Sequence, residues 1–431
     1  MIQRHLSGGT IQVDERDGLM RARGVSYGMA ARFESPQPAR PWPGVRDATQ
    51  PGAACPQRPS RLGFVTGTVV AGLSTSEDCL VLTVTAPAQA GRLPVMVWFH
   101  GGAYVSGSGE SPKYDAAALV REGDVVVVSV SYRLGVFGYV TPGGEDNLGL
   151  RDQILALRWV RDNIAAFGGD PANVTAFGQS AGGDSVMKLM LCEEAAGLFH
   201  RAILQSAPLE LNEGRDRMAQ AMRAAMGTAL ASVEPDEATH AQLLDAQLAA
   251  IQAAQGFGLL GALAFAPQLG RGPLPAVGDL PDRIAEAAGR IELLIGYTRD
   301  DGAPFAAMDR RVAVLDRVPA VARLVTRAAA PALTRRIFGG PAERLAKVWR
   351  KHGGAVGAYR FDWKPEQAPL GACHCMELPL LFESSEAWSD APMLGPDRAI
   401  DAQLAREMRV RWTQFAHRGV ESLPAASMRF G

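Results

Sequence analysis

The chain has 431 residues, a formal net charge of -1, 47% hydrophobic residues and 21% charged residues. Only five of its 44 basic residues are lysine, and no basic block points to nucleic acid or to an anionic membrane as a partner. The length allows a large core but fixes no domain boundary by itself.

Residues 1–10 lack the continuous apolar core of a secretory signal. The longest apolar stretches, near Val95 and Val125, are far too short to span a bilayer. We therefore expect a cytoplasmic protein with no membrane partner. The spacing of the five cysteines does not indicate a zinc site.

Residues 93–99, Leu-Pro-Val-Met-Val-Trp-Phe, predict a buried strand that runs into the tight loop 100–103, His-Gly-Gly-Ala. Acyl transfer places negative charge on a carbonyl oxygen, and fixed backbone N–H groups stabilise that charge. Residues with little or no side chain let a substrate approach such N–H groups. An ordinary strand-to-loop turn would be the simpler interpretation of this segment alone.

Residues 151–167 place five apolar side chains near helical spacing, so we expect a helix that packs one face on a sheet. Strand-like runs alternate with helical segments along the chain, which predicts an α/β fold with a mostly parallel sheet covered on both faces. The five side chains are Ile154, Leu157, Val160, Ile164 and Phe167.

Residues 173–183 predict a strand, a sharp turn at Ser180 and then a helix. Small residues at Gly178 and Gly182 fit a nucleophile elbow, because a bulky side chain there would collide with the turn. G-x-S-x-G is a weak pattern alone, since a glycine-rich turn with a solvated serine is common. Together with the loop after residue 99 it predicts Ser180 as the nucleophile. We assign the oxyanion donors to the backbone of Gly102, Ala103 and Ala181.

A serine nucleophile needs a base. In α/β folds with a nucleophile elbow, an acid and then a histidine follow the serine along the chain. Of the seven histidines, only three follow the best candidates for the acid, Asp300 and Asp301. His352 and His417 are more simply explained as helix C-termini. His374 follows a strand-like run at 358–363 and a Pro/Gly-rich connection, where loops often carry catalytic groups, so we favour His374.

The strand-like run at 291–296 leads into Asp300, Asp301 and Gly302. Either aspartate could serve as the acid, although an acidic pair before glycine is more often a solvated turn. The residues alone leave the choice open. Helical insertions are expected at about 208–285 and 303–350, over the face that carries the active site.

These motifs, in this order, resemble the type-B carboxylesterase and cholinesterase family, including bacterial para-nitrobenzyl esterases. The resemblance implies one α/β-hydrolase domain over residues 1–431, which hydrolyses esters without a cofactor or metal. The matching segments are 76–84, 100–103, 131–135, 147–153, 167–171, 178–183 and 371–379.

Carried over by position, the family's serine is Ser180, its histidine is His374 and its acid is Asp301, with Asp300 as the fallback. The resemblance also implies that Ser206 lies near the acid and supports it. The family usually has glutamate as the acid, so the shorter Asp301 requires its loop to approach the histidine more closely.

Other features follow from the same resemblance. It implies buried ion pairs between Arg32 and Glu77 and between Arg133 and Asp170. It also matches Cys55 and Cys79 to the family's first disulfide, although a reducing cytoplasm would keep both as thiols.

The family usually has glutamate immediately before the serine, where this chain has Gln179. The loss of this anion beside the catalytic histidine favours the neutral imidazole. Gln179 is therefore the residue at which this elbow departs from the family pattern.

We expect a serine carboxylesterase that acts on small or medium acyl or aryl esters, as a monomer or weak homo-oligomer. The same triad could instead act on amides, lactones, carbamates or polyesters. A non-catalytic binding module is disfavoured because such relatives lack a complete triad. A cholinesterase is also disfavoured, because residues 55–79 contain no tryptophan for cation–π contact with a quaternary ammonium.

Overall fold

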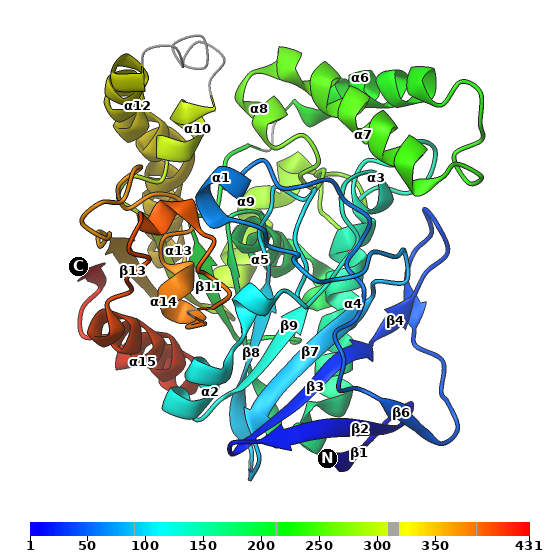
Figure 1. Ribbon diagram of the computed structural model, residues 1–431, viewed down its shortest axis with the longest axis vertical. Helices are drawn as coiled ribbons and strands as arrows, with labels where there is room; N and C mark the ends of the chain where they lie inside the picture. The colour runs from blue at the N-terminus through cyan, green and yellow to red at the C-terminus, as the bar shows by residue number, and fades with distance from the viewer. Residues whose placement is uncertain (90, 212–213, 309–318, 385) are drawn as a thin grey trace.

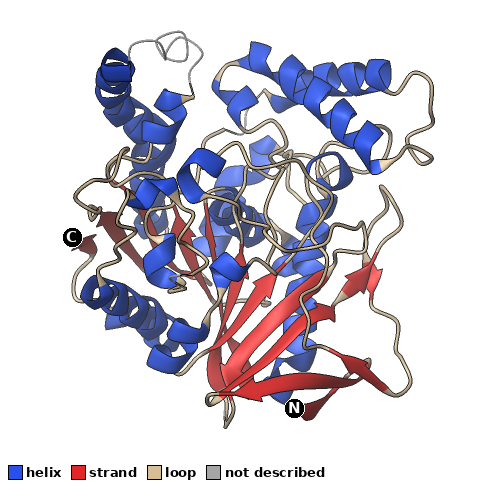
Figure 2. Ribbon diagram, in the orientation of Figure 1, coloured by secondary structure: helices blue, strands red, loops and turns tan. Residues whose placement is uncertain are grey.

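A 12-stranded sheet forms the centre of the computed structural model, which describes residues 1–89, 91–211, 214–308, 319–384 and 386–431 (Figures 1 and 2). Its order is β1-β2-β3-β7-β9-β8-β10-β11-β12-β13-β14, with β6 beside β2, and β4 and β5 pair separately. The strands are β1 (Ile2–Leu6), β2 (Gly9–Arg16), β3 (Leu19–Ser26), β4 (Gly28–Met29), β5 (Gln37–Pro38), β6 (Val45–Asp47), β7 (Val81–Pro87), β8 (Leu93–Phe99), β9 (Val126–Val130), β10 (Gly169–Gln179), β11 (Arg201–Gln205), β12 (Glu292–Thr298), β13 (Val356–Phe361) and β14 (Ser427–Phe430).

In this order, all neighbouring strands from β9 through β8 to β14 are parallel. The strands β1, β2, β3 and β7 form an antiparallel edge. Every residue of β9 is buried, as expected for a parallel strand covered on both faces. The predicted mostly parallel sheet is confirmed, and the predicted strand 93–99 coincides with β8.

Helices cover both faces of the sheet (Figure 2). Successive side chains of a strand point to opposite faces of the sheet, so the apolar residues of β8 need cover on both faces. Val95, Val97 and Phe99 belong to one core cluster, and Met96 and Trp98 belong to the other. The helices are α1 (Gly63–Thr66), α2 (Ala117–Gly123), α3 (Gly135–Gly138), α4 (Leu148–Asn163), α5 (Ala181–Leu191), α6 (Arg215–Ala229), α7 (His240–Ala254), α8 (Leu259–Ala262), α9 (Leu280–Ala288), α10 (Ala303–Ala307), α12 (Pro319–Leu333), α13 (Gly340–Lys351), α14 (Leu378–Leu381) and α15 (Ala402–Arg418).

The helix expected at 151–167 is α4, which begins three residues earlier and ends in a 3-10 turn, Ile164–Phe167. All five apolar side chains that defined it are buried, and α4 contacts β10. His352 and His417 lie at the ends of α13 and α15, as expected.

Two groups of helices lie between successive strands of the sheet. Helices α6 to α9 lie between β11 and β12, and α10, α12 and α13 lie between β12 and β13. Figure 1 shows α6, α7 and α8 above one side of the sheet and α10 and α12 above the other. Within the described ranges, no helix combines the length and the apolar character needed to cross a bilayer.

One of the two expected ion pairs is present and the other is wrong. Arg32 pairs with Glu77, and both side chains are partly exposed. Arg133 pairs with Asp152, with Nη2 and Oδ1 2.7 Å apart, instead of with Asp170. Arg133 follows the carboxyl end of β9 and Asp170 lies at the amino end of β10, so the parallel register places them at opposite edges of the sheet.

Cys55 and Cys79 are free, buried thiols. They contact one another through a side-chain hydrogen bond, and burial further raises the pKa of Cys79. The positional match with the family's first disulfide therefore corresponds to two adjacent thiols in this structure.

The Arg133–Asp152 pair leads to a stability prediction. Both side chains are almost fully buried, and loss of one partner leaves an uncompensated buried charge. We expect Asp152→Asn to lower the free energy of unfolding by about 3–5 kcal/mol, measured by urea denaturation.

The matched control is Asp170→Asn, because the partner of Asp170 is Arg92, whose side chain is 82% exposed. Exposed pairs contribute roughly 0–1 kcal/mol. Equal losses in the two variants would contradict the structural importance of the Arg133–Asp152 pair.

Candidate active site

The strand β10 turns into helix α5 at Ser180, which has the strained backbone angles φ 56° and ψ -123°. The Ser180 N–H donates to the carbonyl of Gln205 at 2.8 Å, which fixes the turn against β11. A Cβ on Gly178 would collide with the backbone of Gly182, and one on Gly182 would overlap the carbonyl oxygen of Phe99. The expected need for small residues on both sides of Ser180 is confirmed.

The loop after β8 lies beside this turn. Gly102 and Ala103 have positive φ angles, 116° and 56°, and a Cβ built on Gly101 would lie 3.2 Å from the Ser180 Cβ. In the described part of the chain, no hydrogen bond uses the N–H of Gly102, Ala103 or Ala181 as donor. The Ala181 N–H is open because the first turn of a helix has no internal acceptor for it.

His100 has a structural position in this loop. Its Nδ1 donates to the Gly101 carbonyl at 2.8 Å, and its ring stacks on Tyr132 with centroids 4.4 Å apart. Burial lowers the pKa of His100 to about 4. The ring is therefore neutral at physiological pH.

A buried side-chain contact connects the loop to α5. The Tyr104 hydroxyl donates to Asp184 Oδ2 at 2.7 Å, and Lys188 Nζ donates to Asp184 Oδ1 at 2.9 Å. Tyr104 directly follows Ala103 and itself has a positive φ of 63°. This contact holds the strained loop against the first turn of the helix that begins after Ser180. No sequence pattern indicates this contact, because tyrosine and aspartate lie 80 residues apart.

His374 and Asp301 meet in the core. Asp301 Oδ1 lies 2.5 Å from His374 Nδ1, and both side chains are fully buried. Asp301 Oδ2 also accepts the Thr298 N–H at 3.1 Å. Two donors from different directions thus fix the carboxylate, and the short side chain of Asp301 reaches the histidine.

Gln179 occupies the other side of the His374 ring. Its side-chain nitrogen lies 3.2 Å from His374 Nε2, and its oxygen accepts from the Cys375 thiol at 3.5 Å. With Nδ1–H directed to Asp301, the Nε2 lone pair accepts the Gln179 amide N–H. Among the described residues, no hydrogen bond joins Ser180 to His374.

Asp300 and Ser206 do not contact His374 by hydrogen bonds in the described structure. Asp300 Oδ2 accepts the Ala372 N–H at 2.8 Å and pairs with Arg299 at 3.0 Å. Ser206 donates its backbone N–H to Gly296, while its buried Oγ has no partner among the described residues. The supporting role of Ser206 stays a prediction.

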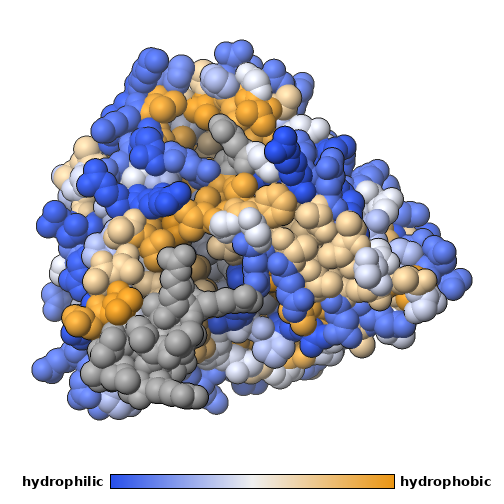
Figure 3. Space-filling model, turned by 90° about the horizontal axis from the view of Figure 1, so that it is seen from above, coloured by the Kyte–Doolittle hydropathy of each residue, from blue (hydrophilic) through white to orange (hydrophobic). Residues whose placement is uncertain are grey.

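A narrow pocket of about 50 Å³ opens beside Ser180, Gly102 and Ala103. Phe305 and Phe338 line it and also pack on the His374 ring, with centroids 5.2 and 5.0 Å away. Both come from the second helical insertion, where nothing local in the sequence marked them. Seen from above, apolar side chains gather across the middle of the face in view (Figure 3).

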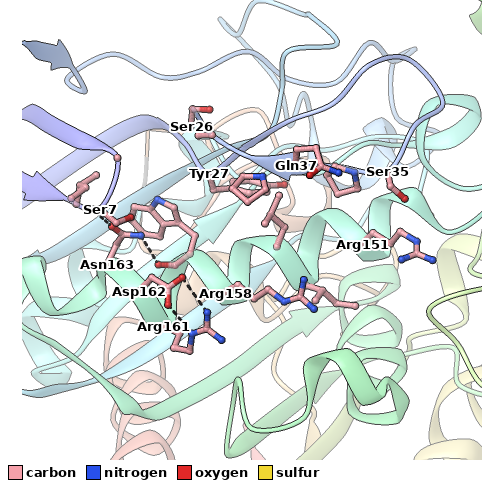
Figure 4. A pocket seen from close by; sticks show the side chains of 18 of the residues that line it. Ser7, Ser26, Tyr27, Ser35, Gln37, Arg151, Arg158, Arg161, Asp162 and Asn163 are labelled. Carbon is pink, nitrogen blue, oxygen red and sulfur yellow. Dashed lines mark hydrogen bonds and ion pairs between the residues drawn. The ribbon is translucent and has the colours of Figure 1, made fainter. Parts of the chain in front are cut away.

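A second hollow of about 450 Å³ lies apart from Ser180, along α4 (Figure 4). Its arginines already have carboxylate partners: Arg151 and Arg158 approach Glu194 at 3.5 and 3.3 Å, and Arg161 approaches Asp162 at 2.7 Å. These charges are therefore compensated within the fold.

Glu377 is a second buried carboxyl close to the Asp301–His374 pair. Burial, reinforced by the charge of Asp301, raises its pKa to about 7. Gln205 donates weakly to one oxygen at 3.4 Å, and the other oxygen has no partner in the described structure.

The model of the carboxylesterase family matches residues 5–318 of this chain. The chain belongs to the carboxylesterase family. Its 42% identity to a probable N-octanoylanthranilate hydrolase of Rhodococcus erythropolis extends over 415 residues, 94% of this chain and 90% of the relative. It is also 35% identical over 453 residues to the para-nitrobenzyl esterase of Bacillus subtilis, and the match covers 97% of this chain and 90% of the relative.

A solved structure of a thermophilic para-nitrobenzyl esterase superposes on this carboxylesterase with a TM-score of 0.82 and 33% identity, covering 98% and 92% of the two chains. The fold is therefore the α/β-hydrolase fold expected from the sequence. This carboxylesterase is a carboxylic ester hydrolase.

Glu377 leads to a prediction on pH dependence. Its pKa rises from an ordinary 4.5 to about 7 on folding, so the unfolded chain loses this proton first, and stability falls as pH rises through that interval. We expect the wild-type free energy of unfolding to decrease by roughly 3 kcal/mol more than that of Glu377→Gln between pH 4.5 and pH 8. Urea denaturation at both pH values measures this, and parallel pH curves for the two proteins would contradict it.

Proposed function

We propose that this carboxylesterase hydrolyses small or medium acyl and aryl esters through an acyl-enzyme on Ser180. The observation that carries the proposal is a set of three backbone N–H groups around a serine on a strained turn. These groups, from Gly102, Ala103 and Ala181, donate to no acceptor in the described part of the chain. Such donors stabilise the negative charge that develops on an ester carbonyl oxygen.

In the proposed mechanism His374 acts as the base, and Asp301 orients it at 2.5 Å. His374 Nε2 takes the Ser180 proton as Oγ attacks the carbonyl carbon. The oxyanion accepts hydrogen bonds from the three N–H groups. The imidazolium then protonates the leaving alcohol. Water repeats the sequence and releases the acid, so neither cofactor nor metal is needed.

Gln179 has to release Nε2 before Ser180 can use it, because its amide occupies that lone pair at 3.2 Å. Catalytic hydrogen bonds often tighten only when substrate is bound. A 180° rotation of the amide would present its oxygen to the imidazolium. Gln179 can thus bond both the neutral and the protonated ring, which a carboxylate in this position would not do equally.

We further propose that the chain forms one domain over residues 1–431, and that it is a cytoplasmic monomer or weak homo-oligomer without nucleic-acid or membrane partners. The small charge of -1 and the absence of a basic block support this. The substrate is a small molecule, in keeping with the narrow pocket.

Amide hydrolysis is the second candidate. The relative with 42% identity is named for an N-octanoyl compound, and the same acyl-enzyme chemistry cleaves amides when the leaving nitrogen is protonated. A set of matched esters and amides of one acyl group would rank the two activities.

The main test is a panel of p-nitrophenyl esters of increasing acyl length with wild type and Ser180→Ala. We expect wild-type turnover and a loss of at least about a thousandfold in Ser180→Ala, because the nucleophile is gone. Turnover that survives in Ser180→Ala would reject the assignment of the nucleophile. No turnover of any ester by wild type would favour a binding module.

The same panel distinguishes the two acid candidates. Asp301→Asn should reduce kcat by about a thousandfold or more, since it removes the anion that orients His374. Asp300→Asn is the matched control, because asparagine keeps an acceptor for the Ala372 N–H. Equal or reversed effects would exclude Asp301 as the acid.

The role of Gln179 has its own test. Gln179→Glu places an anion beside His374 and favours the imidazolium, so the acidic limb of the kcat/KM profile should move to higher pH. The profile of wild type under identical conditions is the control. An unchanged limb would show that residue 179 does not influence the base.

A further inference from the structure

The active-site pocket contains one charged side chain among its described lining residues, Arg61. The rest of the wall is apolar or carries only serine hydroxyl groups. Its apolar members include Leu62, Val105, Leu211, Leu263, Phe305 and Phe338. The guanidinium is therefore the one charged group of the described lining that can bind an anionic part of a substrate.

Arg61 makes a single hydrogen bond to the described residues. Its Nη2 donates to the carbonyl oxygen of Ala262 at 2.8 Å, which brings the guanidinium against another lining residue of the same pocket. It forms no ion pair with any described residue. A guanidinium has five N–H donors, so most of its donors remain available to a ligand.

Arg58, three residues earlier, shows the contrast. It lies outside the lining of the pocket and pairs with Asp245. Both arginines are exposed to solvent, yet among the described residues only Arg58 has a counter-ion. The same short segment therefore holds one cation that is paired and one that has no counter-ion in the described part of the chain.

Protein atoms surround Arg61 although water reaches it, as expected for a group in the wall of an open cleft. Burial lowers the pKa of Arg61, and none of the described acids acts in the opposite direction. A bound anion would offset this desolvation and fit the planar fork of the guanidinium.

We propose that Arg61 selects esters that carry a carboxylate, separated from the scissile ester by an apolar spacer. The inference rests on the proposed function and names the substrate class of the same site. The carboxylate engages Arg61, the spacer lies on the apolar wall and the ester carbonyl reaches Ser180. Arg61 is thus a specificity-determining residue. The carboxylate can belong to the acyl group or to the alcohol.

The test compares substrates that differ only in this group. Monomethyl adipate against methyl adipamate tests the acyl side, and 4-acetoxybenzoate against 4-acetoxybenzamide tests the alcohol side. The readout is the ratio of kcat/KM for carboxylate over carboxamide. A ratio of this kind, compared between variants, cancels the intrinsic reactivity of each ester.

We expect this ratio to fall about tenfold from wild type to Arg61→Gln in one of the two pairs, as for loss of one charged hydrogen bond. Arg61→Lys should retain part of the preference, because it keeps the charge but loses the fork. Raising the salt from 0.05 to 0.5 M should reduce the wild-type ratio. The pair that responds identifies the side that carries the carboxylate.

Arg58→Gln is the matched control, with the same change in net charge on the same segment, and its ratio should equal that of wild type. Equal ratios in wild type and Arg61→Gln for both pairs would overturn the inference, as would an equal loss in Arg58→Gln. Wild-type turnover of the two carboxamides tests the proposed function separately. No turnover of any of the four esters would overturn both.

Discussion

The close approach of β8 to the turn at Ser180 is the constraint on which the rest of the site depends. Gly182 lies so near the Phe99 carbonyl that a single methyl group would not fit between them. This contact joins the end of β8 to the start of α5, the helix that follows the neighbouring strand β10. The loop after β8 and Ser180, which we propose as the oxyanion loop and the nucleophile, are therefore positioned by one piece of backbone packing, and the Tyr104–Asp184 hydrogen bond holds the loop in place.

The electrostatics of the site follow from burial. Asp301, His374 and Glu377 are all fully buried, so each charge needs a partner or becomes costly. Asp301 has its partners in His374 and the Thr298 N–H. Glu377 has only a weak donor, and its proton offsets the cost at low pH.

The sequence was informative where a local rule determines the structure. The strand at 93–99, the helix around Leu157 and the turn at Ser180 depend on periodicity or on glycine, so they could be predicted. Contacts made by the fold could not. The partner assigned to Arg133 was wrong, because the choice between Asp152 and Asp170 depends on which edge of the sheet each occupies. Arg61 and Phe338 reach the pocket from segments that carry no motif.

The placement of the helical insertions has a consequence for how this enzyme can change. Ser180 and Asp301 lie just after the ends of β10 and β12, and His374 lies on the connection that follows β13. Helices α6 to α9 lie between β11 and β12, and α10, α12 and α13 lie between β12 and β13. Whole helices can be lengthened, shortened or replaced while the strand ends stay in register. Substrate range can therefore diverge through insertions and deletions in these two segments, as long as Phe338, which packs on the His374 ring, stays in place.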